Sequence, residues 1–201
     1  EKGRSAGDKW CIGYFIDNEI DWGSTVRVSE LTLQGPKTLA AKKEFVKDLK
    51  KKYFAIEALN KKWDSNYSSW VELLSSREKP DRKKAFQDLA AFLEKFVDTY
   101  FKTCRDAVKK YAPNNLYLGC RINTGNWRLS NAATRYCDIV SCNSYNFLPV
   151  TSYVTNQKDK PIIVGVFHFG AMDRGLFHSG IMSVFSQKQR GRAYIQYIQH
   201  L

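Results

Sequence analysis

The sequence has no apolar run long enough to cross a membrane, little histidine and no regular cysteine pattern. A membrane-spanning helix needs about 20 consecutive apolar residues, so we expect no membrane partner. The five cysteines are odd in number and widely spaced, which excludes a disulfide framework and a metal knuckle. The three histidines, His168, His178 and His200, have no ligand-type spacing with a cysteine or carboxylate. We therefore expect neither a metal nor another cofactor.

Internal repeats, low-complexity tracts and a signal peptide are also absent from the printed sequence. We expect the chain to begin in mid-fold, so the missing signal peptide indicates no cellular compartment. A hydrophobic fraction of 43% is typical of a folded domain and excludes a disordered chain. The 201 residues suffice for one domain with a sizeable core.

The net charge of +12 could indicate a nucleic-acid or polyanion binder. The lysines crowd residues 37–52, however, where apolar residues recur with helical spacing. This pattern predicts an amphipathic helix whose lysines form a solvated face. We therefore expect no nucleic-acid partner, although the charge would assist encounter with an acidic polysaccharide. The lysines in question are Lys37, Lys42, Lys43, Lys47, Lys50, Lys51 and Lys52.

Strand-like apolar runs alternate with helical patterns along the chain, which predicts βαβ units, parallel pairing and an α/β fold. Four strands are too few to close an eight-stranded barrel of about 250 residues. The chain is therefore either part of a barrel or a doubly wound sheet. We expect strands at residues 10–16, 116–122, 138–143 and 161–169, and helices at 38–53, 56–63, 68–74, 80–111, 131–136 and 187–201.

Each expected strand ends in polar or aromatic residues, where α/β proteins carry their active sites. Glu19 follows the first strand, and its carboxyl group is either an ordinary loop charge or a general acid. Glycoside hydrolysis needs such an acid and a second carboxylate, about 5 Å away as a nucleophile or about 6.5–9.5 Å away as a base. The other strand-end candidates are Asp17, Asn18, Arg121, Asn123, Asn143, Tyr145 and His168.

Two motifs carry a resemblance to a known family. GYFIDNEIDWG at residues 13–23 resembles the strand-four segment of clan A retaining glycosidases, in which the acid/base glutamate follows an asparagine. PIIVGVFHFGAMDRGLFHSGI at residues 161–181 resembles the strand-seven segment of family 50 agarases. YLGCR at 117–121 and YCDIVSCNSYNF at 136–147 agree in order. The resemblance implies that residues 1–201 are the carboxyl-side portion of a (β/α)₈ TIM barrel, strands four to seven with their helices.

The resemblance assigns roles to individual residues. Glu19 matches the acid/base and Asn18 a residue that binds a sugar hydroxyl, while Tyr145 falls near the nucleophile. Trp22 and Trp127 either stack on sugars or pack within loops. The remaining residues expected to bind substrate are Arg121, Asn143, His168, Asp173, Arg174 and His178.

The sequence departs from the family at one critical position. Family members have roughly GEFHFG where residues 165–170 are GVFHFG, so Val166 occupies the position of the nucleophilic glutamate. Valine cannot attack an anomeric carbon, and no general acid alone replaces covalent catalysis. Asp173 is a weak candidate for a substitute base. Val166 is consistent with an engineered inactive variant, a natural pseudoenzyme or a sequence error.

The resemblance thus implies a retaining hydrolase of β-glycosidic bonds in agar-type galactans, inactive as written. The alternative is a carbohydrate-binding pseudoenzyme. Cellulose, a β-galactoside or porphyran would fit the bare chemistry equally, and the partner would be a polysaccharide or oligosaccharide. A secreted or periplasmic location follows if the resemblance holds. We also expect further barrel strands or a partner chain to cover the open sheet edges.

Overall fold

The computed structural model describes residues 4–23, 25–123, 125–149, 160–175 and 177–201, which form two compact units. The strand unit contains residues 1–20 and 98–201, and the helical unit contains residues 21–97. Each is described by itself. No helix in the described residues is long and apolar enough to cross a membrane.

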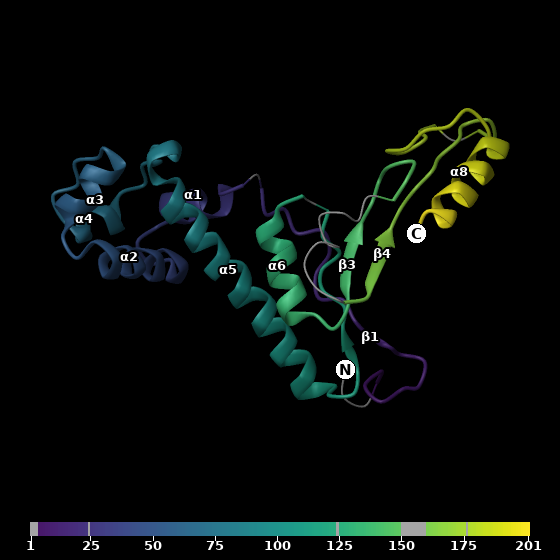
Figure 1. Cartoon of the computed structure of the whole chain (residues 1–201), viewed down its shortest axis with the longest axis horizontal. Coiled ribbons are helices and arrows are strands. Elements are labelled where there is room, and N and C mark those ends of the chain that lie inside the picture. Colours follow the sequence, from purple (N-terminus) through teal and green to yellow (C-terminus); the bar gives the residue numbers. More distant parts are fainter. Residues whose placement is uncertain (1–3, 24, 124, 150–159, 176) are drawn as a thin grey trace. The chain divides into compact units, whose positions relative to one another are not determined.

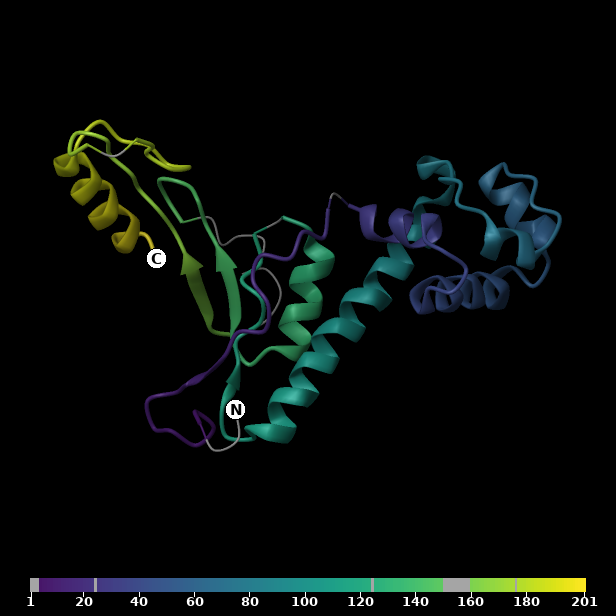
Figure 2. The same ribbon diagram turned by 180° about the vertical axis from the view of Figure 1, so that it is seen from behind.

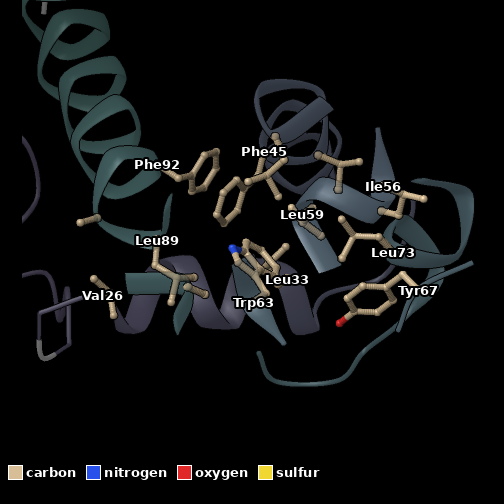
Figure 3. Close-up of a cluster of buried hydrophobic side chains, with 14 residues drawn as sticks. Val26, Leu33, Phe45, Ile56, Leu59, Trp63, Tyr67, Leu73, Leu89 and Phe92 are labelled. Carbon is tan, nitrogen blue, oxygen red and sulfur yellow. The ribbon is translucent and has the colours of Figure 1, made fainter. Parts of the chain in front are cut away.

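The helical unit consists of four helices and the first half of a fifth (Figure 1). Their apolar faces meet in one core, where the rings of Phe45 and Phe92 stack with centroids 4.1 Å apart and Trp63 is buried (Figure 3). The 3.6-residue periodicity predicted the last four of these helices. The bounds are α1 Arg27–Gln34, α2 Ala40–Tyr53, α3 Ile56–Trp63, α4 Trp70–Ser75 and α5 Arg82–Tyr111.

Helix α1 was not predicted, because its buried face is largely polar. Ser29 and Glu30 are fully buried, and the Ser29 hydroxyl donates a hydrogen bond to the Leu89 carbonyl oxygen at 2.7 Å. A helix that buries satisfied polar groups presents no apolar stripe. No side-chain hydrogen bond caps its first turn at Val26 either. Both sequence signals for a helix start are therefore absent.

The strand unit contains two pairs of parallel strands. β1 (Gly13–Tyr14) pairs with β2 (Leu116–Tyr117), and β3 (Val140–Asn143) pairs with β4 (Ile162–Val166). A parallel bridge between Ile122 and Cys142 joins the two pairs, so spatial order follows sequence order. Helix α6 (Trp127–Tyr136) contacts β3, and α8 (Gln187–Gln199) packs through Ala193 and Tyr197 (Figures 1 and 2). The predicted α/β class and parallel pairing are confirmed.

All four strand predictions were longer than the observed strands, and the first two differ most. The run at residues 116–122 is broken because Gly119 and Arg121 have φ angles of 78° and 53°, outside the range of strands. At residues 10–16 only Gly13–Tyr14 form regular ladder pairs. Trp10 is 82% exposed, so this apolar run is not covered along its whole length.

The predicted helix at residues 131–136 begins earlier, at Trp127. The side chain of Asn126 caps it by accepting a hydrogen bond from the Arg128 backbone N–H at 3.2 Å. Trp127 therefore lies in the first turn of α6 and not in a loop, and its ring is 49% exposed beneath the guanidinium of Arg128. Cys120 and Cys142 are buried free thiols, whereas Cys11 is only partly covered.

Candidate active site

Glu19 lies in a turn beyond the carboxyl end of β1, and the backbone of this turn is firmly held. Its N–H donates to the Cys120 carbonyl oxygen at 3.0 Å, and its φ of 46° is in the left-handed region. The Tyr100 hydroxyl on α5 donates to Asp17 Oδ2 at 3.0 Å. Residues in sparsely populated backbone regions persist where the surroundings enforce them, and they cluster at functional sites.

The carboxylate of Glu19 accepts hydrogen bonds from two side chains at the carboxyl end of β3. The Tyr145 hydroxyl donates to Oε1 at 2.7 Å, and the Asn143 amide Nδ2 donates to the same oxygen. Burial, followed by the hydrogen bond to Glu19, raises the pKa of Tyr145. The phenol therefore remains a hydrogen-bond donor at neutral pH. Three predicted site residues thus form one cluster.

Arg121 joins this cluster from the bridge region after β2. Its guanidinium lies 5.1 Å from the centroid of Phe15, and its buried Nε has no hydrogen-bond partner in the described part of the chain. A Cβ on Gly165 would lie 2.7 Å from the Arg121 Cδ and 3.2 Å from the Asn143 Oδ1. A glycine at 165 therefore gives both side chains room beside β4.

Val166 ends β4 directly opposite Asn143. The two residues are register partners, and the Ser144 N–H donates to the Val166 carbonyl oxygen at 3.0 Å. The register shifts between Cys142 and Asn143, so β4 has one extra residue at its carboxyl end. Position 166 therefore lies at the end of β4, beside the end of β3 that carries Asn143, a partner of Glu19.

The strand-seven motif residues lie apart from this hydrogen-bonded cluster. His168 Nε2 lies 2.8 Å from the Ser179 carbonyl oxygen, and His178 Nδ1 accepts from the Gly180 N–H at 2.9 Å. Asp173 Oδ2 accepts from the Gln187 N–H at the start of α8, at 2.9 Å. Asp173 is therefore engaged in helix capping, which argues against a free base. Arg174 is exposed.

A cavity of about 460 Å³ lies between the end of β4 and α8. His168 lines it, together with Phe167, Phe169, Gln187, Arg190, Gly191 and Tyr194. None of the residues around Glu19 does so. The structure therefore does not bring His168 and Glu19 into one described pocket.

The two remaining candidates differ in exposure. Asn18 is exposed beside Glu19, as a sugar-binding residue must be. Trp22 is only 5% exposed and meets Phe96 edge-on with ring centroids 6.3 Å apart. This burial favours packing, one of its two expected roles, over stacking on a sugar face.

Sequence reasoning missed the contribution of Tyr100. It lies on the apolar stripe of α5, where an aromatic residue is expected to fill the core, yet its hydroxyl holds the Asp17 turn. No sequence signal distinguishes the two roles. In the described residues, no group of three His, Cys, Asp or Glu side chains could hold a metal ion.

Parallel α/β folds carry their active sites at the carboxyl ends of their strands, where this carboxylate, amide and phenol gather. Comparison with known proteins identifies the class. The model of glycoside hydrolase family 42, described as beta-galactosidase, matches residues 5–189, and the chain belongs to this family.

The chain is also similar to agarases. It is 38% identical to beta-agarase B of Vibrio sp. (strain JT0107) over 95% of its length, but it spans only 22% of that protein. Two solved structures, an agarase called AgWH50C and an exo-beta-agarase, are each 37% identical over 95% of the chain, with TM-scores of 0.85 and 0.87. The chain covers 29% and 28% of these structures. It is therefore an agarase-like glycoside hydrolase domain that spans about a fifth to a third of its relatives.

Proposed function

We propose that this chain is part of a retaining hydrolase of agar-type galactans, in which Glu19 is the acid/base and position 166 is that of the nucleophile. The observation that carries the proposal is the hydrogen bonding of Glu19 by Tyr145 and Asn143, with Asn143 in register with position 166. A retaining enzyme needs an acid and a nucleophile about 5 Å apart. The agarase relatives supply the substrate class.

Val166 makes this chain catalytically silent under the proposal. Glu19 can protonate a leaving oxygen, but position 166 offers no carboxylate to form the glycosyl–enzyme bond. Asp173 is a poor substitute because its carboxylate bonds the first N–H of α8. Arg121, Asn143, Tyr145 and Asn18 would contact the sugar or orient the acid. His168, Arg174 and His178 would bind more distant sugar units.

The barrel portion is also part of the proposal. Parallel strands in consecutive spatial order support strands four to seven of a (β/α)₈ barrel, because a doubly wound sheet reverses its order. Trp10, in the turn before β1, is 82% exposed, and Phe185, in the loop between β4 and α8, is 90% exposed. Further barrel strands or a partner chain would cover them.

The decisive experiment is Val166→Glu in the native gene product, with Val166→Gln as the matched control. The proposal predicts that only the glutamate variant releases reducing ends from agarose and that the new end keeps its anomeric configuration by proton NMR. Adding Glu19→Gln should then reduce turnover by about 10²–10⁴-fold, the usual contribution of a general acid. An inverted product, or equal rates for the two 166 variants, would contradict the proposal.

Val166 itself favours a second candidate, a carbohydrate-binding pseudoenzyme. In that case Val166→Glu stays silent while the protein still binds agar oligosaccharides. Isothermal titration with a neoagaro-oligosaccharide separates this outcome from a site that has lost both functions.

A further inference from the structure

Phe54 directly follows the last residue of α2 and has a strained backbone conformation. Its φ and ψ are 61° and −53°, and the Ala55 N–H donates to the Tyr53 carbonyl oxygen at 2.6 Å, which closes a γ-turn of the positive-φ kind. This turn is rare and strained. Phe54 is nonetheless 83% exposed. A bulky aromatic residue in this conformation gains nothing from burial, and glycine would adopt it without strain.

Lysines share the face of α2 that leads to Phe54. Lys43, Lys47 and Lys50 precede it by 11, 7 and 4 residues, so all lie on one side of the helix, with Lys51 adjacent. We call Lys43, Lys47, Lys50, Lys51 and Phe54 the α2 surface. All five residues are exposed.

The acidic residues of α2 are already paired. Glu44 contacts Lys47 and Lys95, and Asp48 lies 2.6 Å from the Lys95 ammonium. Lys43, Lys50 and Lys51 form no ion pair in the described part of the chain. The α2 surface therefore keeps several cations free to meet an external anion.

Lysines in the last turn of a helix also stabilise its dipole. That explains Lys50 and Lys51, but it explains neither Lys43, three turns earlier, nor an exposed ring held in a strained turn. An aromatic face beside fixed cations matches an anionic sugar chain, because the ring stacks on the C–H face of a pyranose and the ammonium groups contact its ester groups.

We propose that the α2 surface binds sulfated galactan chains. Phe54 stacks on a galactose ring, and Lys43, Lys50 and Lys51 contact sulfate esters on that and neighbouring units. The choice of a galactan rests on the proposed function. The surface belongs to the helical unit and is separate from the residues that bond Glu19.

The test is affinity electrophoresis of the 201-residue chain in native gels that contain porphyran, desulfated porphyran or no polysaccharide. Phe54→Ala should weaken retardation by both polysaccharides by about 2- to 12-fold, the range for one aromatic stacking contact. Lys50→Gln with Lys51→Gln should weaken binding to the sulfated chain alone. The matched control, Lys61→Gln with Lys62→Gln on α3, removes the same charge and should change binding less than twofold.

Phe54→Gly separates binding from folding. Glycine relieves the strain of the γ-turn, so this variant should melt at a higher temperature while binding as weakly as Phe54→Ala. The proposal is overturned if parent chain is not retarded by porphyran, if the α3 control loses as much binding, or if random-sequence DNA competes as well as porphyran. If Val166→Glu is active but the Phe54 variants bind as well as the parent chain, the binding role of the α2 surface is refuted and the proposed function is not. If Val166→Glu is inactive but binding depends on Phe54, the hydrolase proposal is refuted and the binding role of the α2 surface is not.

Discussion

The buried ion pair of the helical unit gives a stability prediction that can be worked out from the structure. Glu30 is fully buried, and its two oxygens accept hydrogen bonds from Arg82 Nε and Nη2, each at 2.6 Å. Arg82→Met leaves that carboxylate with the Lys79 ammonium, 3.7 Å away, and the more distant charge of Arg27. Removing one partner of a buried pair costs about 3–5 kcal/mol. Because Lys79 remains, we expect a loss of about 2–3 kcal/mol.

Glu30→Gln is the complementary change, and it should cost less. Arg82 is 45% exposed, so its guanidinium can return to water when the carboxylate is removed. The loss should be that of a hydrogen bond to a charged group, about 1.5 kcal/mol. A larger loss of unfolding free energy for Arg82→Met than for Glu30→Gln would therefore show that Glu30, and not Arg82, is the partner that stays buried.

The pH dependence follows from the same contacts. The Arg82 hydrogen bonds hold the pKa of Glu30 below its ordinary value of 4.5. The unfolded state thus takes up the proton first as pH falls, and the stabilisation, fully present above pH 4.5, is lost as pH drops through the folded-state pKa. The stability difference between the parent chain and Glu30→Gln should therefore shrink below this pH.

Urea unfolding at pH 7 and pH 3, followed by tryptophan fluorescence, measures these effects. Trp22, Trp63 and Trp70 lie in the helical unit and report on it. The reasoning would be refuted if Arg82→Met and Glu30→Gln lost the same free energy of unfolding at pH 7. It would also be refuted if the difference in unfolding free energy between the parent chain and Glu30→Gln were the same at pH 3 as at pH 7.

Two further predictions concern the strand unit. A Cβ on Gly170 would lie 1.7 Å from a backbone carbonyl oxygen, so Gly170→Ala should lower the free energy of unfolding by about 3 kcal/mol through strain. A Cβ on Gly191 of α8 would meet open space, so Gly191→Ala should raise the free energy of unfolding by about 0.5–1 kcal/mol. Thermal melts of both variants test this pair. Asp173→Ala removes the acceptor of the Gln187 N–H and should cost about 1 kcal/mol, while Arg174→Ala, its exposed neighbour, should change the unfolding free energy by less than about 0.5 kcal/mol. Equal effects within either pair would contradict the assignment.

The parts of the fold that the sequence predicted are those with a periodic apolar pattern. Helix α3 was predicted at its observed bounds, and α5 was predicted from one long stripe. Helix α1 was missed because it buries Ser29 and Glu30, whose partners lie more than 50 residues away. Strand lengths were overestimated because no sequence pattern shows that Arg121 takes a positive φ.

The part of the candidate site that could be predicted from the sequence is the part that lies at the carboxyl ends of the strands, because these ends meet at one edge of the sheet. Glu19, Asn143 and Tyr145 were expected there, and the structure joins them by hydrogen bonds. The motif around His168 was expected in the same place, but its imidazole meets the loop that follows it. A motif assigns residues to a region of the chain, whereas loop conformation decides which side chains reach the reacting centre. Trp22 illustrates this, since exposure cannot be read from residue type.

Arg121 bears on how Val166 should be understood. A buried guanidinium N–H without a partner costs about 1–3 kcal/mol, and the Nε of Arg121 is in that state beside the strand end that carries Val166. A site that had drifted freely after losing its reaction would have little reason to keep this group, or to keep two donors on one oxygen of Glu19. Under the proposed function, the Arg121 Nε is a donor from which a carboxylate at position 166 could accept a hydrogen bond. The intact hydrogen bonds to Glu19 and this free donor therefore favour the hydrolase proposal over a drifted pseudoenzyme.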